Sequence, residues 1–152
     1  MHTKGKRASL IPENMRKAMP LLTLRTLDGS VWKMDEHREK VVVVNYWASW
    51  CEPCWTEIPE LVRLSQELGP KGLAIVGVAM DEGGEEKIRA FVQRFKVTYP
   101  IALPEPMSQM TYGLDGLPTT ILVDRKGRVA KIYSGAVREE DLRADLDLLL
   151  KD

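Results

Sequence analysis

Several features that would point to particular functions are missing from this 152-residue sequence. Its 22 lysine and arginine residues are balanced by 22 aspartate and glutamate residues, so the formal net charge is zero. A chain without a global field has no electrostatic preference for nucleic acid or an anionic membrane surface. The sequence contains no internal repeat or low-complexity tract, and its length fits one domain with a conventional core.

The amino-terminal region lacks a long apolar run. Residues 1–20 include basic side chains but no stretch of the length that a secretory signal or membrane anchor requires. Two interpretations stay open: the protein is cytoplasmic, or it is extracytoplasmic and its signal or anchor is missing from this sequence. We expect residues 1–19 to form a flexible segment and residues 20–152 to form the folded domain.

Cysteine and histidine are too few for a structural zinc site. The chain has two cysteines, Cys51 and Cys54, and two histidines, His2 and His37, which both lie upstream. A structural zinc ion needs about four such ligands. A purely structural disulfide is also disfavoured, because so short a loop constrains the unfolded chain little. The Cys-x-x-Cys spacing therefore favours a redox dithiol.

The position of the dithiol supports redox chemistry. It directly follows the apolar, β-branched run 41–47, which indicates a buried central strand, and an amphipathic pattern over 54–68 predicts a helix after it. Unpaired backbone N–H groups and the helix dipole at such a helix start stabilise a thiolate, so Cys51 is the predicted nucleophile. Cys54, three residues later, lies within reach on the same side. Pro53 suits the first turn, where its missing N–H has no helical partner anyway.

The rest of the chain alternates apolar runs with amphipathic segments. The expected elements are a hairpin at 21–25 and 31–33, strands at 73–80, 99–103, 119–124 and 129–134, helices at 85–95 and 138–150, and a short helical turn at 107–112. Strands and helices alternate at first, and the last two strands form an antiparallel hairpin with its turn at residues 124–127. This order implies an α/β fold with a mixed sheet and helices on both faces.

The sequence resembles the thioredoxin fold, and within it the extracytoplasmic TlpA/ResA/CcmG-type thiol–disulfide oxidoreductases, over roughly residues 20–150. The segments that carry the resemblance are Asn45-Tyr46-Trp47-Ala48-Ser49-Trp50-Cys51-Glu52-Pro53-Cys54, Glu57 and Pro59 in the following helix, and Gly116-Leu117-Pro118-Thr119-Thr120. It implies a thioredoxin-like fold: a central mixed β-sheet flanked by helices, with an N-terminal β-hairpin and a helix-containing insertion, at residues 85–95, before a cis-proline.

The resemblance also assigns a substrate-docking region. It implies that the Leu117–Pro118 peptide bond is cis and faces the dithiol, where the adjacent backbone pairs with an extended substrate. From the residues alone, Pro118 could equally be a turn residue that opens a strand. Trp47 is expected in the core, because it ends a buried strand. The expected substrate-binding residues, an apolar rim with its neighbours, are Trp50, Trp55, Leu117, Glu52 and Pro53.

Charged and amide side chains near the dithiol suggest how protons are handled. Glu57 lies three residues after Cys54, a helical spacing that could place its carboxylate beside the second thiol. It could also be a solvated glutamate that complements the helix dipole, but the resemblance favours a catalytic role in proton exchange with Cys54. Asn45 stands where thioredoxin has a buried aspartate. Glu52 adds negative charge near Cys51, which disfavours the thiolate and argues against a very strong oxidant.

These features predict a thiol–disulfide oxidoreductase. The Cys51 thiolate attacks a substrate disulfide, and Cys54 resolves the mixed disulfide. No cofactor is expected beyond this cysteine pair. One alternative is a peroxiredoxin-like thiol peroxidase, but the residues before Cys51 lack the proline and threonine of the Pro-x-x-x-Thr-x-x-Cys pattern. The other is a non-enzymatic copper chaperone of the Sco type, which spaces its cysteines by three residues and needs a histidine downstream of them; no histidine follows His37 here.

The resemblance finally implies partners and a location. The reaction is expected to run in the reductive direction on protein disulfides, with the haem-attachment cysteines of apocytochrome c as a possible substrate. A membrane thiol reductase would supply the electrons. The expected location is the periplasm or another extracytoplasmic compartment, with the cytoplasm as the alternative. We expect a monomer that binds neither nucleic acid nor a metal.

Overall fold

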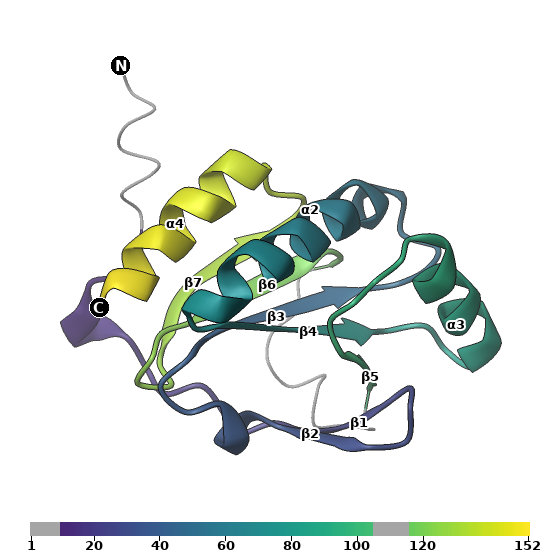
Figure 1. The fold of residues 1–152 in the computed structure, drawn as a ribbon, viewed down its shortest axis with the longest axis horizontal. Coiled ribbons are helices and arrows are strands. Elements are labelled where there is room, and N and C mark those ends of the chain that lie inside the picture. The colour runs from purple at the N-terminus through teal and green to yellow at the C-terminus, as the bar shows by residue number, and fades with distance from the viewer. Residues whose placement is uncertain (1–9, 105–115) are drawn as a thin grey trace.

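The structure is a computed structural model that describes residues 10–104 and 116–152. Its strands form one seven-stranded mixed sheet in the order β2-β1-β5-β4-β3-β6-β7 (Figure 1). The strands are β1 (Thr23–Thr26), β2 (Val31–Lys33), β3 (Val41–Trp47), β4 (Leu73–Ala79), β5 (Ile101–Leu103), β6 (Thr119–Val123) and β7 (Val129–Ser134). The α-helices are α2 (Glu52–Leu68), α3 (Glu85–Arg94) and α4 (Glu139–Lys151), and the 3-10 turns are η1 (Glu13–Met15), η2 (Met34–His37) and η3 (Gly69–Lys71).

The predicted elements within the described residues are all present. β3 has the predicted bounds, and α2 begins at Glu52, two residues earlier than expected, with Cys51 as its N-cap. Strand β5 begins at Ile101 rather than residue 99. The helical turn expected at 107–112 lies outside the described residues.

Strand β3 is the centre of the sheet. It pairs in parallel with β4 and antiparallel with β6, and all of its residues are buried. Alternate side chains enter two separate apolar cores, one on each face: Val41, Val43 and Trp47 pack in the first, and Val42 and Val44 in the second. Burial on both faces explains why this strand is almost continuously apolar.

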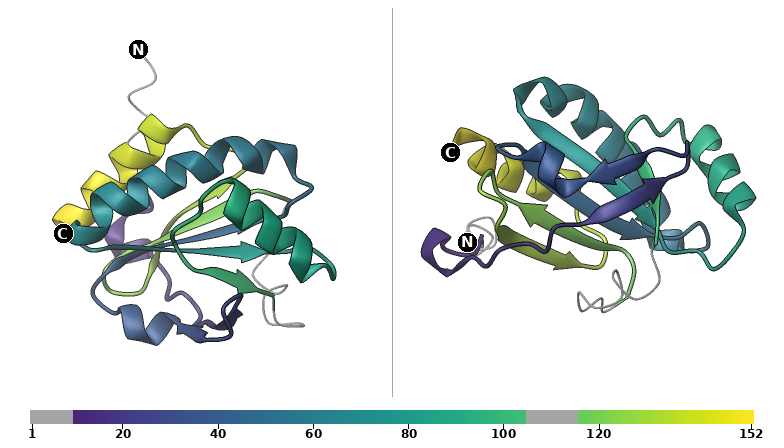
Figure 2. Two further views of the ribbon diagram at one scale, coloured as in Figure 1. Left: turned by 45° about the vertical axis from the view of Figure 1, so that its right-hand side comes forward. Right: turned by 90° about the horizontal axis from the view of Figure 1, so that it is seen from below.

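The three α-helices of the described residues cover one face of the sheet. Helices α2, α3 and α4 all contribute side chains to the core that contains Trp47, and Figure 2 shows the β1–β2 hairpin and η2 on the opposite side. The expectation of helices on both faces is therefore not met within these residues. The physical reason is topological: the crossovers from β3 to β4 and from β4 to β5 advance in the same direction along the sheet, and right-handed crossovers then place both helices on one face.

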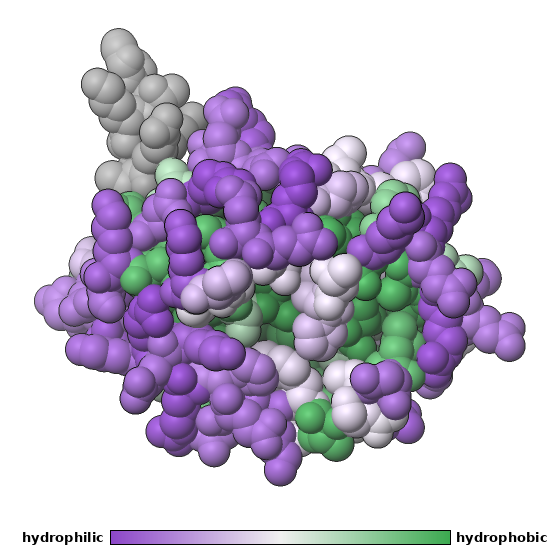
Figure 3. Space-filling view, viewed as in Figure 1, coloured by the Kyte–Doolittle hydropathy of each residue, from purple (hydrophilic) through white to green (hydrophobic). Residues whose placement is uncertain are grey.

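The second face is closed by shorter elements. Leu24 and Trp32 of the hairpin, Met34 of η2, and Met19 and Leu22 before β1 pack against the sheet there. On the helical face, Figure 3 shows mostly hydrophilic residues over α2 and α4, with hydrophobic residues visible between α2 and α3. No helix in the described ranges is long and apolar enough to cross a membrane.

Residues 10–19, here named the N-terminal strap, pack on the domain instead of lying apart from it. Backbone hydrogen bonds of 2.8 Å join Lys17 to β7 and Met19 to the β6–β7 turn. The Arg16 guanidinium pairs with Asp124 at 2.9 Å, and these two side chains are 7% and 5% exposed. This revises the expected boundary at residue 20, because a buried ion pair, backbone hydrogen bonds and the buried side chain of Met19 fix the segment on the domain.

Candidate active site

The cysteine pair lies where the central strand passes into the longest helix. After β3 ends, the Cys51 backbone N–H donates to the Ala48 carbonyl at 3.1 Å, which closes a tight turn before α2. Cys51 and Cys54 form a disulfide with their Cα atoms 5.4 Å apart. Cys51 is 4% exposed and Cys54 is 1% exposed. Cys51, at the N-cap, is thus the more accessible sulfur-bearing residue.

The three tryptophans around the pair differ as the sequence predicts. Trp47 is fully buried and packs against Phe91 with ring centroids 4.8 Å apart. Trp50 and Trp55 are 67% and 38% exposed. The residue before Cys51 and the residue after Cys54 therefore each expose a large apolar ring to solvent.

The proline segment reaches the same end of the sheet. The Leu117–Pro118 peptide bond is cis, as the resemblance implied. Thr119 pairs with Tyr46 in the β3–β6 ladder, so Pro118 lies at the end of β3 that leads into the dithiol. Leu117 is half-buried and packs against the core cluster that contains both cysteines. Leu117 and Pro118 thus lie at the end of the sheet that carries the dithiol.

Glu57 is buried at 3% exposure, so it is not the solvated glutamate that the sequence left open. Its Oε2 accepts a hydrogen bond of 2.5 Å from the Val137 backbone N–H, and its Oε1 accepts one of 3.5 Å from Asn45 Nδ2. Burial raises the pKa of Glu57 to about 7, and repulsion by Glu60 adds to this, against the opposing effect of the two hydrogen bonds. The carboxyl can therefore hold or release a proton near neutral pH.

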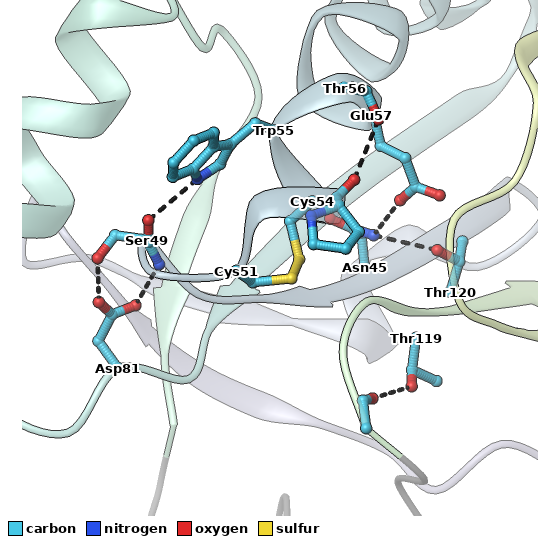
Figure 4. The surroundings of a disulfide bond; sticks show 12 residues. Asn45, Ser49, Cys51, Cys54, Trp55, Thr56, Glu57, Asp81, Thr119 and Thr120 are labelled. Carbon is cyan, nitrogen blue, oxygen red and sulfur yellow. Dashed lines mark hydrogen bonds between the residues drawn. A yellow bond between two sulfur atoms is a disulfide. The ribbon is translucent and has the colours of Figure 1, made fainter.

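Asn45 links Glu57 to the neighbouring strand. Its Nδ2 also donates to Thr120 Oγ1 at 3.0 Å, and Figure 4 shows the amide between the glutamate and the threonine. Sequence reasoning placed Asn45 at the strand end but did not predict its contact with Thr120 or the contact of Glu57 with Val137. The motif that contains Thr120 was the only available signal, and it does not say which side chains meet.

A further set of contacts was missed entirely. The Asp81 carboxylate accepts hydrogen bonds from the Ser49 backbone N–H at 3.0 Å and the Ser49 hydroxyl at 2.5 Å. The Ser49 carbonyl oxygen accepts one from Trp55 Nε1 at 3.0 Å. We name Asp81, Ser49 and Trp55 the Trp55 bracket (Figure 4).

The chemistry available to this arrangement follows from its two sulfurs. Two cysteines that close a disulfide at the start of a helix can exchange that disulfide with another dithiol. Within the described residues no three His, Cys, Asp or Glu side chains are grouped so that they could hold a metal ion. On a thioredoxin-like sheet, such a pair defines a thiol–disulfide oxidoreductase.

Comparison with known proteins gives the family. The family model described as Redoxin matches residues 14–148, and the chain belongs to this family. Thiol-disulfide oxidoreductase ResA of Geobacillus thermodenitrificans is 34% identical over 131 residues, which cover 84% of this chain and 74% of the relative.

Solved structures of other proteins share this fold. A protein of Chlorobium tepidum that bears the name thiol:disulfide interchange protein DsbE matches with a TM-score of 0.81 at 27% identity, covering 89% of this chain and 96% of its own. A secreted thiol-disulfide isomerase of Corynebacterium glutamicum shares the fold, with a TM-score of 0.83 at 24% identity over 94% and 91% of the two chains. The ResA-like branch of the thioredoxin fold, expected from the sequence, is confirmed.

Proposed function

We propose that this oxidoreductase works in the reductive direction on disulfides of other proteins. The Cys51 thiolate attacks one sulfur of a substrate disulfide, and the other substrate sulfur leaves as a thiolate that takes up a proton. The Cys54 thiolate then attacks Cys51 in the mixed disulfide and releases the second substrate sulfur. Two electrons pass to the substrate, and the Cys51–Cys54 disulfide remains. No further cofactor takes part in this scheme.

One observation carries the proposal: a buried carboxyl with a pKa of about 7 lies one helical turn beyond the second cysteine. Cys54 must lose a proton before it can resolve the mixed disulfide, and the Glu57 carboxylate can accept it. Before that step, the negative charge of Glu57 raises the pKa of a nearby thiol. Glu57→Gln is therefore expected to lower the pH at which the reduced cysteine pair titrates. Glu60→Gln, on the same helix face, is the matched control for loss of a nearby charge.

The docking surface completes the scheme. Trp50 and Trp55 supply exposed apolar area, and Leu117 and Pro118 bring backbone to the end of β3 where an extended chain could pair with it. The exposed side chains of Glu52 and Pro53 lie in the first turn of α2 and border this surface. The substrate is therefore a polypeptide segment around a cysteine.

Partners and location extend the proposal. We infer that the substrates include extracytoplasmic proteins such as apocytochrome c and that a membrane thiol reductase returns the electrons. Support comes from the ResA-type relative and from the secreted isomerase that shares the fold. The protein is proposed to act as a monomer in the periplasm or an equivalent compartment.

The test is the reduction potential of the cysteine pair. The protein is equilibrated in dithiothreitol or glutathione buffers, free thiols are alkylated, and the fraction oxidised is read by mass. A value at or below about −270 mV supports a reductant, whereas a value near about −120 mV makes the protein a disulfide donor and overturns the direction. Cys54→Ser should accumulate mixed disulfides through Cys51; if none form, the two-step exchange is wrong.

A further inference from the structure

The Trp55 bracket joins the loop after β4 to the turn and the helix that carry the dithiol, and Asp81 lies 32 residues from Ser49 in the sequence. Asp81 belongs to the loop between β4 and α3, Ser49 to the turn that leads into the dithiol, and Trp55 to the first turns of α2. Each carboxylate oxygen of Asp81 accepts one hydrogen bond from Ser49. Of the three residues, Trp55 is the one with an exposed side chain, whereas Ser49 and Asp81 are partly buried.

The bracket fixes one exposed tryptophan but not the other. Trp55 is 38% exposed, and its indole N–H is bound to Ser49 at 3.0 Å. Trp50 is 67% exposed and makes no hydrogen bond through its indole within the described part of the chain. A ring that is already fixed loses little conformational entropy when a partner covers it, and tryptophan offers a large apolar area for such contact. Trp55 is the preorganised binding element of the two.

The fixed ring is close to the nucleophile. Trp55 follows Cys51 by four residues, so the two share one side of the start of α2. Its hydrogen bond to Ser49 holds the ring against the turn that enters Cys51, as Figure 4 shows. A side chain next to a substrate cysteine that is bonded to Cys51 would therefore meet this ring.

We propose that Asp81 is a positioning residue for substrate selection. Through Ser49 it holds the Trp55 indole as a fixed apolar platform, and the platform favours polypeptides with a large apolar side chain next to the cysteine that Cys51 attacks. The inference rests on the proposed disulfide exchange and specifies its substrate class.

The experiment compares three substrates of the reduced protein. Two are disulfide peptides that differ only in the residue next to the cysteine, phenylalanine or serine, and the third is 2-hydroxyethyl disulfide, which has no side chain to place on the ring. Asp81→Asn keeps the size of the side chain but leaves one acceptor in place of two. The matched control is Glu82→Gln, which removes the same charge from the same loop. The Glu82 side chain makes no hydrogen bond within the described residues.

We expect Asp81→Asn to raise KM for the phenylalanine peptide about three- to tenfold, with kcat unchanged, since this is the cost of ordering one large side chain on binding. The serine peptide and the small disulfide should keep wild-type KM and kcat. Glu82→Gln should match the wild type on all three substrates. In the NMR spectrum, hydrogen exchange at Trp55 Nε1 should be slow in the wild type and faster in Asp81→Asn.

Several outcomes would overturn the proposal. An equal loss on all three substrates would mean that the variant disturbs the redox centre itself. A raised KM with unchanged exchange at Trp55 would mean that the carboxylate contacts the peptide directly. Equal wild-type KM values for the two peptides would exclude the platform without any variant. Failure of the proposed function would look different, because the reduced wild type would then reduce none of the three disulfides.

Discussion

The buried carboxyl of Glu57 should make the stability of the folded protein depend on pH. The perturbation that reveals this is Glu57→Gln, which keeps an oxygen to accept the Val137 N–H and removes the ionisable group. In the folded protein, burial raises the pKa of Glu57 from 4.5 to about 7. In the unfolded chain the carboxyl is solvated and regains its ordinary pKa.

The sign and size of this pH dependence follow from the difference between the pKa of Glu57 in the folded and in the unfolded protein. A group with a raised pKa in the folded state contributes its stability below pH 4.5 and loses that contribution as the pH rises through about 7. A tenfold difference in proton affinity is worth about 1.4 kcal/mol, so the loss is about 3 kcal/mol for this carboxyl. The glutamine variant does not titrate. Its free energy of unfolding, relative to the wild type, should therefore rise by about 3 kcal/mol between pH 4 and pH 8.

The assay is equilibrium unfolding in guanidinium chloride at intervals across this pH range, with the Cys51–Cys54 disulfide intact so that the thiols do not titrate. Glu60→Gln is a useful second variant, since the charge of Glu60 raises the pKa of Glu57. Its removal should move the loss of stability to lower pH without abolishing it. A difference between Glu57→Gln and wild type that stays constant across the range would refute the reasoning.

Three other substitutions test separate parts of the structure. Pro118→Ala should slow the reduction of protein disulfides, measured with an insulin-type turbidity assay, and wild-type rates would contradict the docking role. Gly77→Ala should cost about 1–3 kcal/mol in thermal or denaturant unfolding, because a Cβ there would lie 3.0–3.2 Å from three side-chain atoms; an unchanged midpoint would show that the site can relax. Arg16→Ala should cost about 1.5–3 kcal/mol at neutral pH, since it removes one charged hydrogen-bond partner of the buried Asp124, which keeps Arg128 at 3.1 Å. A loss below about 0.5 kcal/mol would mean that the pair acts like an exposed one.

Local patterns were enough to predict the central elements. The almost continuously apolar sequence of β3 matches its burial on both faces, and the cysteine spacing at the following helix predicts the disulfide. The different exposures of Trp47, Trp50 and Trp55 followed from their positions relative to the strand end and the helix start. These properties depend on residues that are near one another in the sequence.

Contacts between distant segments could not be predicted in the same way. Val137 lies 80 residues from Glu57, and Asp81 lies 32 residues from Ser49. Sequence spacing does not say which loop reaches which helix turn. The fixed positions of Ser49 and Asp81 depend on the parallel pairing of β3 with β4, which brings both strand ends to the same edge of the sheet.

The strap at residues 10–19 has a consequence for any shortened form of the protein. β7 is the last strand of the sheet, and the strap supplies backbone partners for its first residues. A polypeptide cut at residue 20 would leave those N–H and C=O groups open beside Ile132, whose side chain is 45% exposed. An uncovered edge with an exposed aliphatic side chain is a template for pairing between molecules. Truncation there is therefore expected to produce a protein that aggregates as its concentration rises.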